Sequence, residues 1–403
     1  MKSNSCIVCH SIELKRILSI GDFPPANLLT EKPNEEVSSL DLNLMYCTSC
    51  GHLQQEFFYD EKELFSNYLY QSSTSKTLDD FFKFISDLTI SSLDPGSSIL
   101  EIACNDGIFL EKFKHSQINT VGVEPAINIA QIATDKGLNV INSFWPVKTD
   151  KKFDAIFAFN VLAHGPQPMK FFESMLFALD DKGFLAIQVS QINILSNYEF
   201  DTVYHEHFSF FTKSSLHFLA TKYELNLNLF HTNIHGGSGF AIYTRKNMKS
   251  KFVQTLRDSM PSNFLIEEFN NFELPSLLDV EKFSNFATDL KINLNNFIER
   301  QKKQNKKIVL VGAAAKAITV LYFSNLEPDY VVDEAPLKIN KYIPSTNIKI
   351  DNFNTLNAIN EDCAFIIGAW NFFDELTSKI KKIRPPERFK DVIYTYYPKE
   401  IEI

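Results

Sequence analysis

Long hydrophobic runs and an excess of positive charge are both missing from this 403-residue sequence. No apolar stretch reaches the roughly 18 residues that a membrane-spanning helix needs, so no span is predicted. The formal net charge of -9 at pH 7 argues against a nucleic-acid-binding surface, because such a surface needs a basic face. Residues 1–6 contain no apolar core of the kind found in signal peptides. We therefore expect a cytoplasmic enzyme with neither membrane nor nucleic-acid partners.

Cysteine is also scarce, and the chain has six. Four of them form two C-x-x-C pairs, namely Cys6, Cys9, Cys47 and Cys50. Each pair can turn two thiolates toward one centre, so two pairs complete a tetrahedral four-sulfur site. A closed site leaves no position for water, and the sequence therefore predicts a structural zinc in a small N-terminal module. Four unrelated free thiols are the alternative, and His10 and His52 are spare ligands.

Residues 98–125 predict a strand, a tight turn, a helix and a second strand that ends in an acid. Ser98–Cys104 is a short apolar run, as in buried parallel strands. Gly107 permits the turn, because glycine adopts positive φ without steric cost. Thr120–Val123 is followed by Glu124, whose carboxylate can accept hydrogen bonds from both hydroxyls of a ribose. The pattern indicates the nucleoside-binding half of a doubly wound sheet.

This turn lacks the G-x-G-x-x-G spacing of dinucleotide-binding sites. An acid within the first strand, Glu101, a looser turn and a closing acid together resemble class I S-adenosylmethionine-dependent methyltransferases. An ordinary βαβ unit with a chance acid is the alternative.

Strand and helix patterns alternate through residues 76–247, which predicts a parallel sheet. Leu225–His231 and Gly239–Arg245 end this region as two strands with a short link, and a terminal antiparallel pair also belongs to the methyltransferase pattern. Ligands in such sheets lie beyond the carboxyl ends of the strands. Three polar segments are expected there: Asn160–His164, Ser190–Gln191 and Tyr204–Ser209.

The segment Tyr204–His207 is the best catalytic candidate. A histidine beside a carboxylate can be poised near neutral pH, as a general base must be. Tyr204 and His164 are candidates to stabilise a developing oxyanion. The alternatives are a purely structural network of hydrogen bonds within a loop and a metal site on His205 and His207.

Residues 248–403 predict a second βαβ domain. Lys307–Lys316 reads as a strand, a small-residue turn at Gly312 and a helix start, and Tyr330–Asp333 is a strand that again ends in an acid. The backbone amides of the turn and the helix N-terminus suit a pyrophosphate, and Lys316 adds positive charge. A purely structural turn is the alternative.

The whole chain resembles the zinc-containing sugar C-methyltransferases of deoxysugar biosynthesis, which methylate C3 of nucleotide-linked 4-keto sugars. Seven segments carry the resemblance, in chain order: the first cysteine pair, residues 21–27, the second cysteine pair with Gly51, and residues 101–107, 160–164, 204–207 and 235–238. The family usually carries an asparagine after the lysine of the C-terminal turn, whereas this chain has Ala317–Thr319 there. Gly239–Phe240 occupies positions where the family commonly has a longer polar side chain. These departures concern the identity of the substrate rather than the reaction class.

The resemblance implies an α/β fold with a class I methyltransferase sheet. It implies a zinc module at 1–75, an S-adenosylmethionine-binding domain at 76–247 and a Rossmann-like domain at 248–403 that helps to hold the nucleotide-sugar. The implied catalytic residues are Tyr70, His164, Tyr204, Glu206 and His207, with His207 as the base. The implied cofactor-binding residues are Glu101, Ala103, Asn105, Gly107, Glu124 and Asn160. The implied substrate-binding residues are His235, Gly312 and Lys316.

The implied reaction is a C-methylation through an enolate. A C–H bond beside a ketone is acidic enough for a positioned imidazole to remove its proton, and the resulting carbon attacks the sulfonium methyl group. Two rival functions use the same scaffold: a sugar O-methyltransferase in which His207 deprotonates an alcohol, and a non-catalytic zinc-ribbon binding protein.

Overall fold

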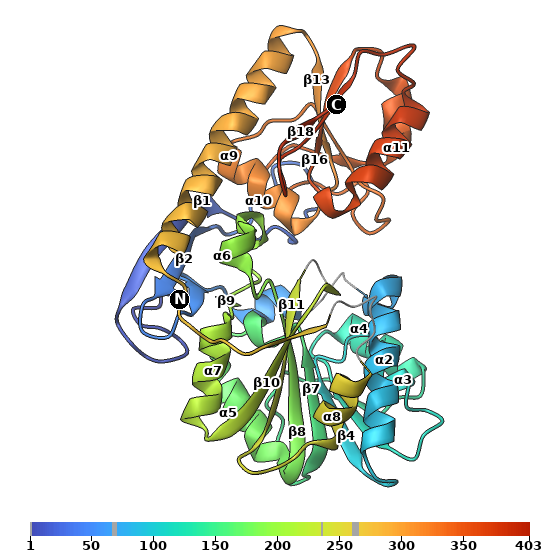
Figure 1. Cartoon of the computed structure of the whole chain (residues 1–403). Coiled ribbons are helices and arrows are strands. Elements are labelled where there is room, and N and C mark those ends of the chain that lie inside the picture. The colour runs from blue at the N-terminus through green and yellow to red at the C-terminus, as the bar shows by residue number, and fades with distance from the viewer. Residues whose placement is uncertain (1, 67–70, 235–236, 260–265) are drawn as a thin grey trace.

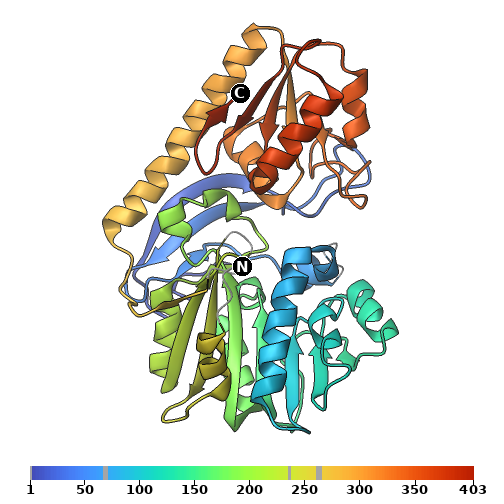
Figure 2. The ribbon, with the colours of Figure 1, turned by 45° about the vertical axis from the view of Figure 1, so that its right-hand side comes forward.

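The computed structural model describes residues 2–66, 71–234, 237–259 and 266–403. These residues form three β-sheets, in an N-terminal module, a central domain and a C-terminal domain. The N-terminal sheet lies between the central domain, at the bottom of the view, and the C-terminal domain, at the top (Figures 1 and 2). Within the described ranges, no helix combines the length and the apolar character needed to cross a membrane.

The N-terminal sheet is antiparallel and has the strand order β1-β2-β3-β9. Its strands are β1 (Leu14–Phe23), β2 (Leu40–Cys47), β3 (Leu53–Gln55) and β9 (Ser209–Phe210), and helix α1 (Glu61–Phe65) follows β3. Strand β9 belongs in sequence to the central domain, since it lies more than a hundred residues beyond β3. The N-terminal module and the central domain are therefore joined by strand pairing.

The central sheet has the order β12-β10-β11-β8-β7-β4-β5-β6. Its strands are β4 (Ser98–Ile102), β5 (Asn119–Val123), β6 (Val140–Ile141), β7 (Phe153–Phe159), β8 (Leu179–Ser190), β10 (Leu225–Thr232), β11 (Ser238–Arg245) and β12 (Glu267–Phe269). The strands β4, β5, β6, β7 and β8 run parallel to one another, and β11 lies antiparallel between β8 and β10. The predicted parallel sheet with a terminal antiparallel pair is confirmed.

Helices cover both faces of the central sheet because its strands are apolar on both sides. In β4, for example, Leu100 and Ile102 pack with α5 and α7, whereas Ile99 packs on the opposite face with α2, α3 and α8. The helices of this domain are α2 (Lys76–Ser92), α3 (Ile108–Glu111), α4 (Ile127–Asp135), α5 (Pro168–Ala178), α6 (Ile194–Asn197), α7 (Lys213–Lys222) and α8 (Lys251–Asp258). This is the doubly wound architecture that the sequence predicts.

The C-terminal sheet has the order β15-β14-β13-β16-β17-β18, parallel except for β18. Its strands are β13 (Lys307–Val311), β14 (Tyr330–Val332), β15 (Ile350–Asp351), β16 (Cys363–Ile367), β17 (Val392–Thr395) and β18 (Ile401–Glu402). Its helices are α9 (Leu277–Lys303), α10 (Ala315–Ser324) and α11 (Phe373–Ile383). A second βαβ domain is thus confirmed, as a mixed sheet.

One apolar core joins the N-terminal sheet to the C-terminal domain. It contains Leu42 and Leu44 of β2, Phe283 of α9 and Ile308 of β13, all of them fully buried. Helix α9 runs from beside the N-terminal sheet up to the far end of the C-terminal domain (Figure 1). The module boundaries at residues 75 and 247 stay a prediction, although β12, beyond 247, pairs with β10.

Candidate functional site

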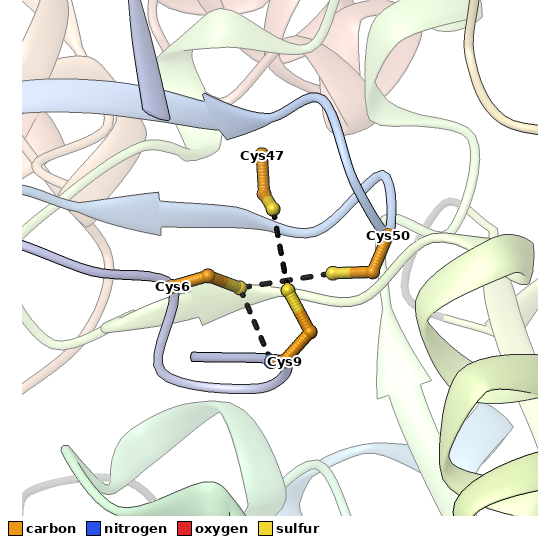
Figure 3. Close-up of side chains that lie close together, drawn as sticks. All are labelled: Cys6, Cys9, Cys47 and Cys50. Carbon is orange, nitrogen blue, oxygen red and sulfur yellow. Dashed lines mark hydrogen bonds between the residues drawn. The ribbon is translucent and has the colours of Figure 1, made fainter. Parts of the chain in front are cut away.

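Four thiol groups converge beside the N-terminal sheet (Figure 3). They belong to the predicted ligands Cys6, Cys9, Cys47 and Cys50, whose sulfur atoms all lie within 4.8 Å of one another. The sulfur atoms of Cys6 and Cys50 are 3.7 Å apart, and those of Cys9 and Cys47 are 3.5 Å apart. A tetrahedron with metal–sulfur bonds of about 2.3 Å spaces its sulfur atoms by about 3.8 Å, so this group fits zinc.

Gly51 completes the turn of the second cysteine pair, and the turn requires glycine. Its φ is +75°, and a Cβ atom here would lie 2.2 Å from the Ser214 hydroxyl oxygen. The spare ligands His10 and His52 are outside the thiol group. Instead, the His52 Nε2 lies 3.2 Å from the Ser209 hydroxyl oxygen on β9.

A cavity of about 790 Å³ opens at the carboxyl ends of the central strands. Its wall comes from three parts of the chain. The N-terminal module supplies residues 27–29 and part of α1, the central domain supplies the ends of β4, β5, β7 and β8, and the C-terminal domain supplies residues 335–338. Ligands of doubly wound sheets bind at this end of the strands.

The turn after β4 and the acid after β5 form the part of the cavity wall that is predicted to bind the nucleoside. Glu124 accepts hydrogen bonds from the backbone N–H of Asn105 and of Ala126, each 2.9 Å long, one on each carboxylate oxygen. Each oxygen keeps a second lone pair for a hydroxyl group. Burial raises the pKa of Glu124. The Glu124 carboxylate therefore both fixes the turn and lines the cavity.

Backbone strain is concentrated around the same cavity. Ala103, Asn105, Asn160 and Gln191 all line it and all have left-handed backbones, with φ between 50° and 56°. Left-handed non-glycine residues are costly and cluster at functional sites. The Asn160 Oδ1 and Gln191 Oε1 atoms are buried without a partner among the described residues, so a bound ligand can satisfy them.

Two of the predicted cofactor residues do not line the cavity. Glu101 is 3% exposed, and burial together with the Glu124 and Asp106 charges raises the pKa of its carboxyl well above the usual value. Gly107 is the N-cap residue just before α3. Its φ is +76°, and a Cβ atom there would lie 2.2 Å from the Leu138 side chain. Gly107 thus permits close helix packing, while Ala103, Asn105, Glu124 and Asn160 face the cavity.

His207 and Tyr204 form a hydrogen-bonded pair in the cavity wall. The His207 Nδ1 lies 3.2 Å from the Thr202 carbonyl oxygen, which can only accept, so this nitrogen carries the proton of the neutral ring. Nε2 is then an acceptor, and the Tyr204 hydroxyl donates to it over 2.9 Å. Burial and the neighbouring His164 hold the pKa of His207 well below its usual value, which keeps the ring neutral.

His164 and Glu206 complete this cluster. The His164 Nδ1 donates to the Glu206 carbonyl oxygen over 2.7 Å, and burial lowers the pKa of the ring. The side chain of Glu206 accepts at Oε1 from the Asn27 backbone N–H over 3.0 Å. Its Oε2 has no partner among the described residues, and burial raises the pKa of the carboxyl. Both side chains line the cavity.

His205, by contrast, faces the N-terminal module. Its Nε2 donates to the Leu40 carbonyl oxygen over 2.9 Å, and its ring packs between those of Phe23 and Tyr59. The four cysteines are the one metal-ligand group found among the described residues, so the metal site considered on His205 and His207 is not formed there.

Three family models match the chain, one after another. A zinc-binding domain model matches residues 6–65, a methyltransferase domain model matches residues 70–228, and a model of the C-methyltransferase C-terminal domain matches residues 233–388. This chain is an S-adenosylmethionine-dependent C-methyltransferase. Its cofactors are S-adenosylmethionine and the zinc ion of the four-cysteine site.

Known proteins with similar sequences or structures include one that matches over most of its length. The C-methyltransferase NovU of Streptomyces niveus is 23% identical over 395 residues, which cover 94% of this chain and 92% of NovU. A possible histamine N-methyltransferase of Thermotoga maritima matches 42% of this chain and 92% of its own, with 21% identity and a TM-score of 0.33. A protein of Pyrococcus horikoshii matches 47% of this chain and all of its own, with 16% identity and a TM-score of 0.37.

Of the substrate-binding residues predicted for this C-methyltransferase, Gly312 and Lys316 do not line the cavity. The Ala313 N–H next to Gly312 donates to Asp333 over 2.6 Å, so the chain's own carboxylate occupies an amide expected to bind pyrophosphate. The Lys316 ammonium lies over the Trp370 ring, 3.7 Å from its centroid. The predicted Tyr70 and His235 lie outside the described residues, and their roles stay predictions.

Sequence reasoning about the C-methyltransferase missed several residues of the cavity wall. Lys338 is the most informative, because it is the single lysine or arginine among the described residues of that wall. Its ammonium donates to the Ala313 carbonyl oxygen over 2.8 Å. The only sequence signal was its position shortly after Asp333, in the loop that follows a strand of the second βαβ unit.

Substitution of Glu124 tests the part of the cavity predicted to bind the nucleoside. Glu124→Ala should weaken S-adenosylhomocysteine binding by roughly 30-fold, because hydrogen bonds to a charged group contribute about 2 kcal/mol. Isothermal titration measures the effect. The matched control is Asp333→Ala, which removes the equivalent acid after β14 and should leave that affinity unchanged. An affinity of Glu124→Ala within about threefold of wild type would contradict the assignment.

Proposed function

We propose that this C-methyltransferase acts on a nucleotide-linked keto sugar, by removing a proton beside the ketone and methylating the resulting enolate carbon. The observation that carries the proposal is the neutral His207–Tyr204 pair, which lines the same cavity as the strand ends that suit the nucleoside of the cofactor. S-adenosylmethionine supplies an electrophilic methyl group when it is bound. The chain's own residues must supply a base, a donor for the enolate oxygen, and positioning.

His207 is the proposed base. Its Nε2 is unprotonated and accepts the Tyr204 hydroxyl hydrogen, so the phenol proton moves to Nε2 as the phenol oxygen takes the proton from the substrate carbon. A depressed pKa keeps the imidazole in the basic form throughout the neutral range. His207 and Glu206 are both buried, and hydrogen bonds are stronger where the local dielectric constant is low.

The enolate oxygen requires a hydrogen-bond donor, and Glu206 is the proposed one. Burial raises the pKa of its carboxyl, which favours the protonated form. In the proposed role the carboxyl carries a proton at Oε2, the oxygen without a partner among the described residues, because Oε1 accepts from the Asn27 N–H. His164 was expected from the sequence to stabilise the oxyanion. Its Nδ1–H is instead bonded to the Glu206 carbonyl oxygen, so this nitrogen is not free to donate to the enolate.

Hydrogen exchange tests the reaction class. In deuterium oxide, with S-adenosylhomocysteine bound, the protein should exchange the hydrogen beside the ketone of a nucleotide-linked keto sugar, because deprotonation does not require the methyl group. A sugar O-methyltransferase on the same scaffold would methylate without exchange. Mass spectrometry of a small panel of nucleotide-linked keto sugars distinguishes the two. Absence of both exchange and C-methylation across the panel would refute the proposal.

Lys338 supports a negatively charged acceptor, because it is the single lysine or arginine of the described cavity wall. The Ala313 carbonyl oxygen and the Asp333 carboxylate, 3.9 Å away, hold its ammonium in place. Lys338→Met should raise KM for the nucleotide-linked sugar roughly 10-fold, with little change in S-adenosylhomocysteine affinity, because a charge-assisted hydrogen bond is lost. The control is Lys341→Met. Lys341 pairs with Glu31 at 2.9 Å outside the cavity, so that variant should keep the wild-type KM. Equal KM values for the two variants would exclude Lys338 from acceptor binding.

A further inference from the structure

The zinc module holds the segment that carries the proposed catalytic residues. Strand β3 pairs antiparallel with β9, with Leu53 opposite Phe210 and Gln54 opposite Ser209. The pairing continues one step further, where the backbone N–H of Gln55 donates to the Phe208 carbonyl oxygen over 3.1 Å. Strand β9 begins two residues after His207, so its pairing with β3 fixes where the segment 204–207 ends.

The Gln55 side chain reaches past this pairing into the catalytic segment itself. Its amide nitrogen donates to the Tyr204 carbonyl oxygen and to the His207 carbonyl oxygen, each over 2.8 Å. Both amide hydrogens are thereby used, one at each end of the segment. Gln55 has no exposed surface, so no solvent competes for these bonds. The side chain therefore fixes the backbone on both sides of Glu206.

The neighbouring glutamine makes the equivalent connection to the metal site. Gln54 accepts at Oε1 from the Ile7 N–H over 2.8 Å and donates through Nε2 to the Ser5 carbonyl oxygen over 3.2 Å. Ile7 lies within the first cysteine pair, between two of the zinc ligands. Two consecutive residues of one short strand thus connect the metal turn to the catalytic segment.

We propose that Gln55 is a positioning residue for C-methyl transfer, through which the folded zinc module sets the geometry of the Tyr204–His207 pair. This inference rests on the proposed function, because it takes His207 as the base. Gln55 touches neither cofactor nor acceptor, since it is absent from the cavity wall. It acts by keeping two backbone carbonyl groups in place, and with them the phenol and the imidazole that must face the acceptor.

The expected effect lies in turnover rather than in cofactor binding. Loss of a residue that orients a catalytic group without touching the substrate typically lowers activity roughly 10- to 100-fold. A displacement of about 1 Å can lower the rate roughly 100-fold. Gln55→Met keeps the side-chain volume and removes both donors. It should lower kcat by roughly 10- to 100-fold, while S-adenosylhomocysteine affinity stays within about twofold and the zinc content of the purified chain stays unchanged.

A spectroscopic measurement separates positioning from a general loss of stability. The chain is labelled with nitrogen-15 histidine and studied by nuclear magnetic resonance. The His207 ring signals are those that are absent from the spectrum of His207→Ala. Gln55→Met should shift those signals, because the ring loses its fixed partners, and should leave the His217 signals unchanged. The control is Gln301→Met, which removes another buried glutamine, 2% exposed, from α9. It should change neither kcat nor the His207 signals.

Failure of this inference and failure of the proposed function are distinguishable. If His207→Ala retains wild-type kcat, the proposed base is wrong. If His207→Ala loses activity while Gln55→Met retains kcat within about twofold, the positioning role is wrong. Should Gln55→Met not fold, Gln55→Glu is measured instead, since it keeps the shape of the side chain and replaces the donor nitrogen by oxygen. It should show the same fall in kcat, and full turnover would overturn the proposal.

Discussion

His207→Ala is expected to lower kcat by about 10³-fold, while the affinity for S-adenosylhomocysteine changes by less than about threefold. The ring is the one neutral acceptor paired with a phenol in the cavity wall of the described chain, and its removal leaves the Tyr204 hydroxyl without this partner. The part of the cavity predicted to bind the nucleoside is built by other residues, around Glu124. Rapid-quench kinetics and calorimetry measure the two quantities separately.

The control for this variant is His217→Ala. His217 lies on α7, stacked on the Phe272 ring and outside the cavity, so its loss should leave kcat unchanged. Activity of His207→Ala above about a tenth of wild type would remove His207 as the base, because general bases usually contribute at least 100-fold. Loss of S-adenosylhomocysteine binding would instead indicate a role in shaping the cavity.

Cys50→Ser should abolish zinc binding and, with it, turnover. Structural zinc sites contribute about 10–16 kcal/mol to the folding of small metal modules, so three remaining thiolates cannot hold the N-terminal module in its present form. That module supplies part of the cavity wall and both hydrogen bonds from Gln55. We expect kcat to fall by at least about 100-fold, the loss typical of displaced catalytic groups. Metal analysis by mass spectrometry and thermal unfolding measure the loss of the module.

The matched control is Cys363→Ala, which removes a buried thiol on β16 of the C-terminal domain. That variant should keep its zinc and its turnover. A Cys50→Ser protein with a full zinc content would show that the four sulfur atoms do not act as one site. A zinc-free Cys50→Ser protein with wild-type kcat would show that the module is not needed for catalysis.

Most elements of the central domain could be predicted from sequence, because each is encoded by neighbouring residues. The apolar run at 98–104 becomes β4, and the spacing at 126–136 becomes α4, with boundaries shifted by one or two residues. The spacing within each cysteine pair also predicts the metal site, because the two intervening residues form a turn that brings both thiols to one side. Gly51 and Gly107 likewise mark positions where only glycine fits.

Contacts between distant segments could not be predicted in the same way. Nothing near Gln55 in the sequence indicates that its amide meets Tyr204, 149 positions later. The turn at Gly312 has the composition of a pyrophosphate site, yet its amide is occupied by Asp333, which only the fold reveals. Lys338 enters the cavity because the C-terminal domain is placed against the central one. The four predicted catalytic residues within the described chain share one cavity, but their roles stay predictions until the variants are measured.

If Lys338 binds the acceptor as proposed, the three-part wall of the cavity makes acceptor choice separable from donor chemistry. The predicted contacts to the methyl donor come from segments of the central domain, whereas residues 335–338 come from the C-terminal domain. Exchange of the C-terminal domain between related enzymes should therefore redirect the reaction to a new acceptor while the donor stays the same. Inheritance of whole domains, rather than gradual change within one pocket, then offers such enzymes a direct path to new products.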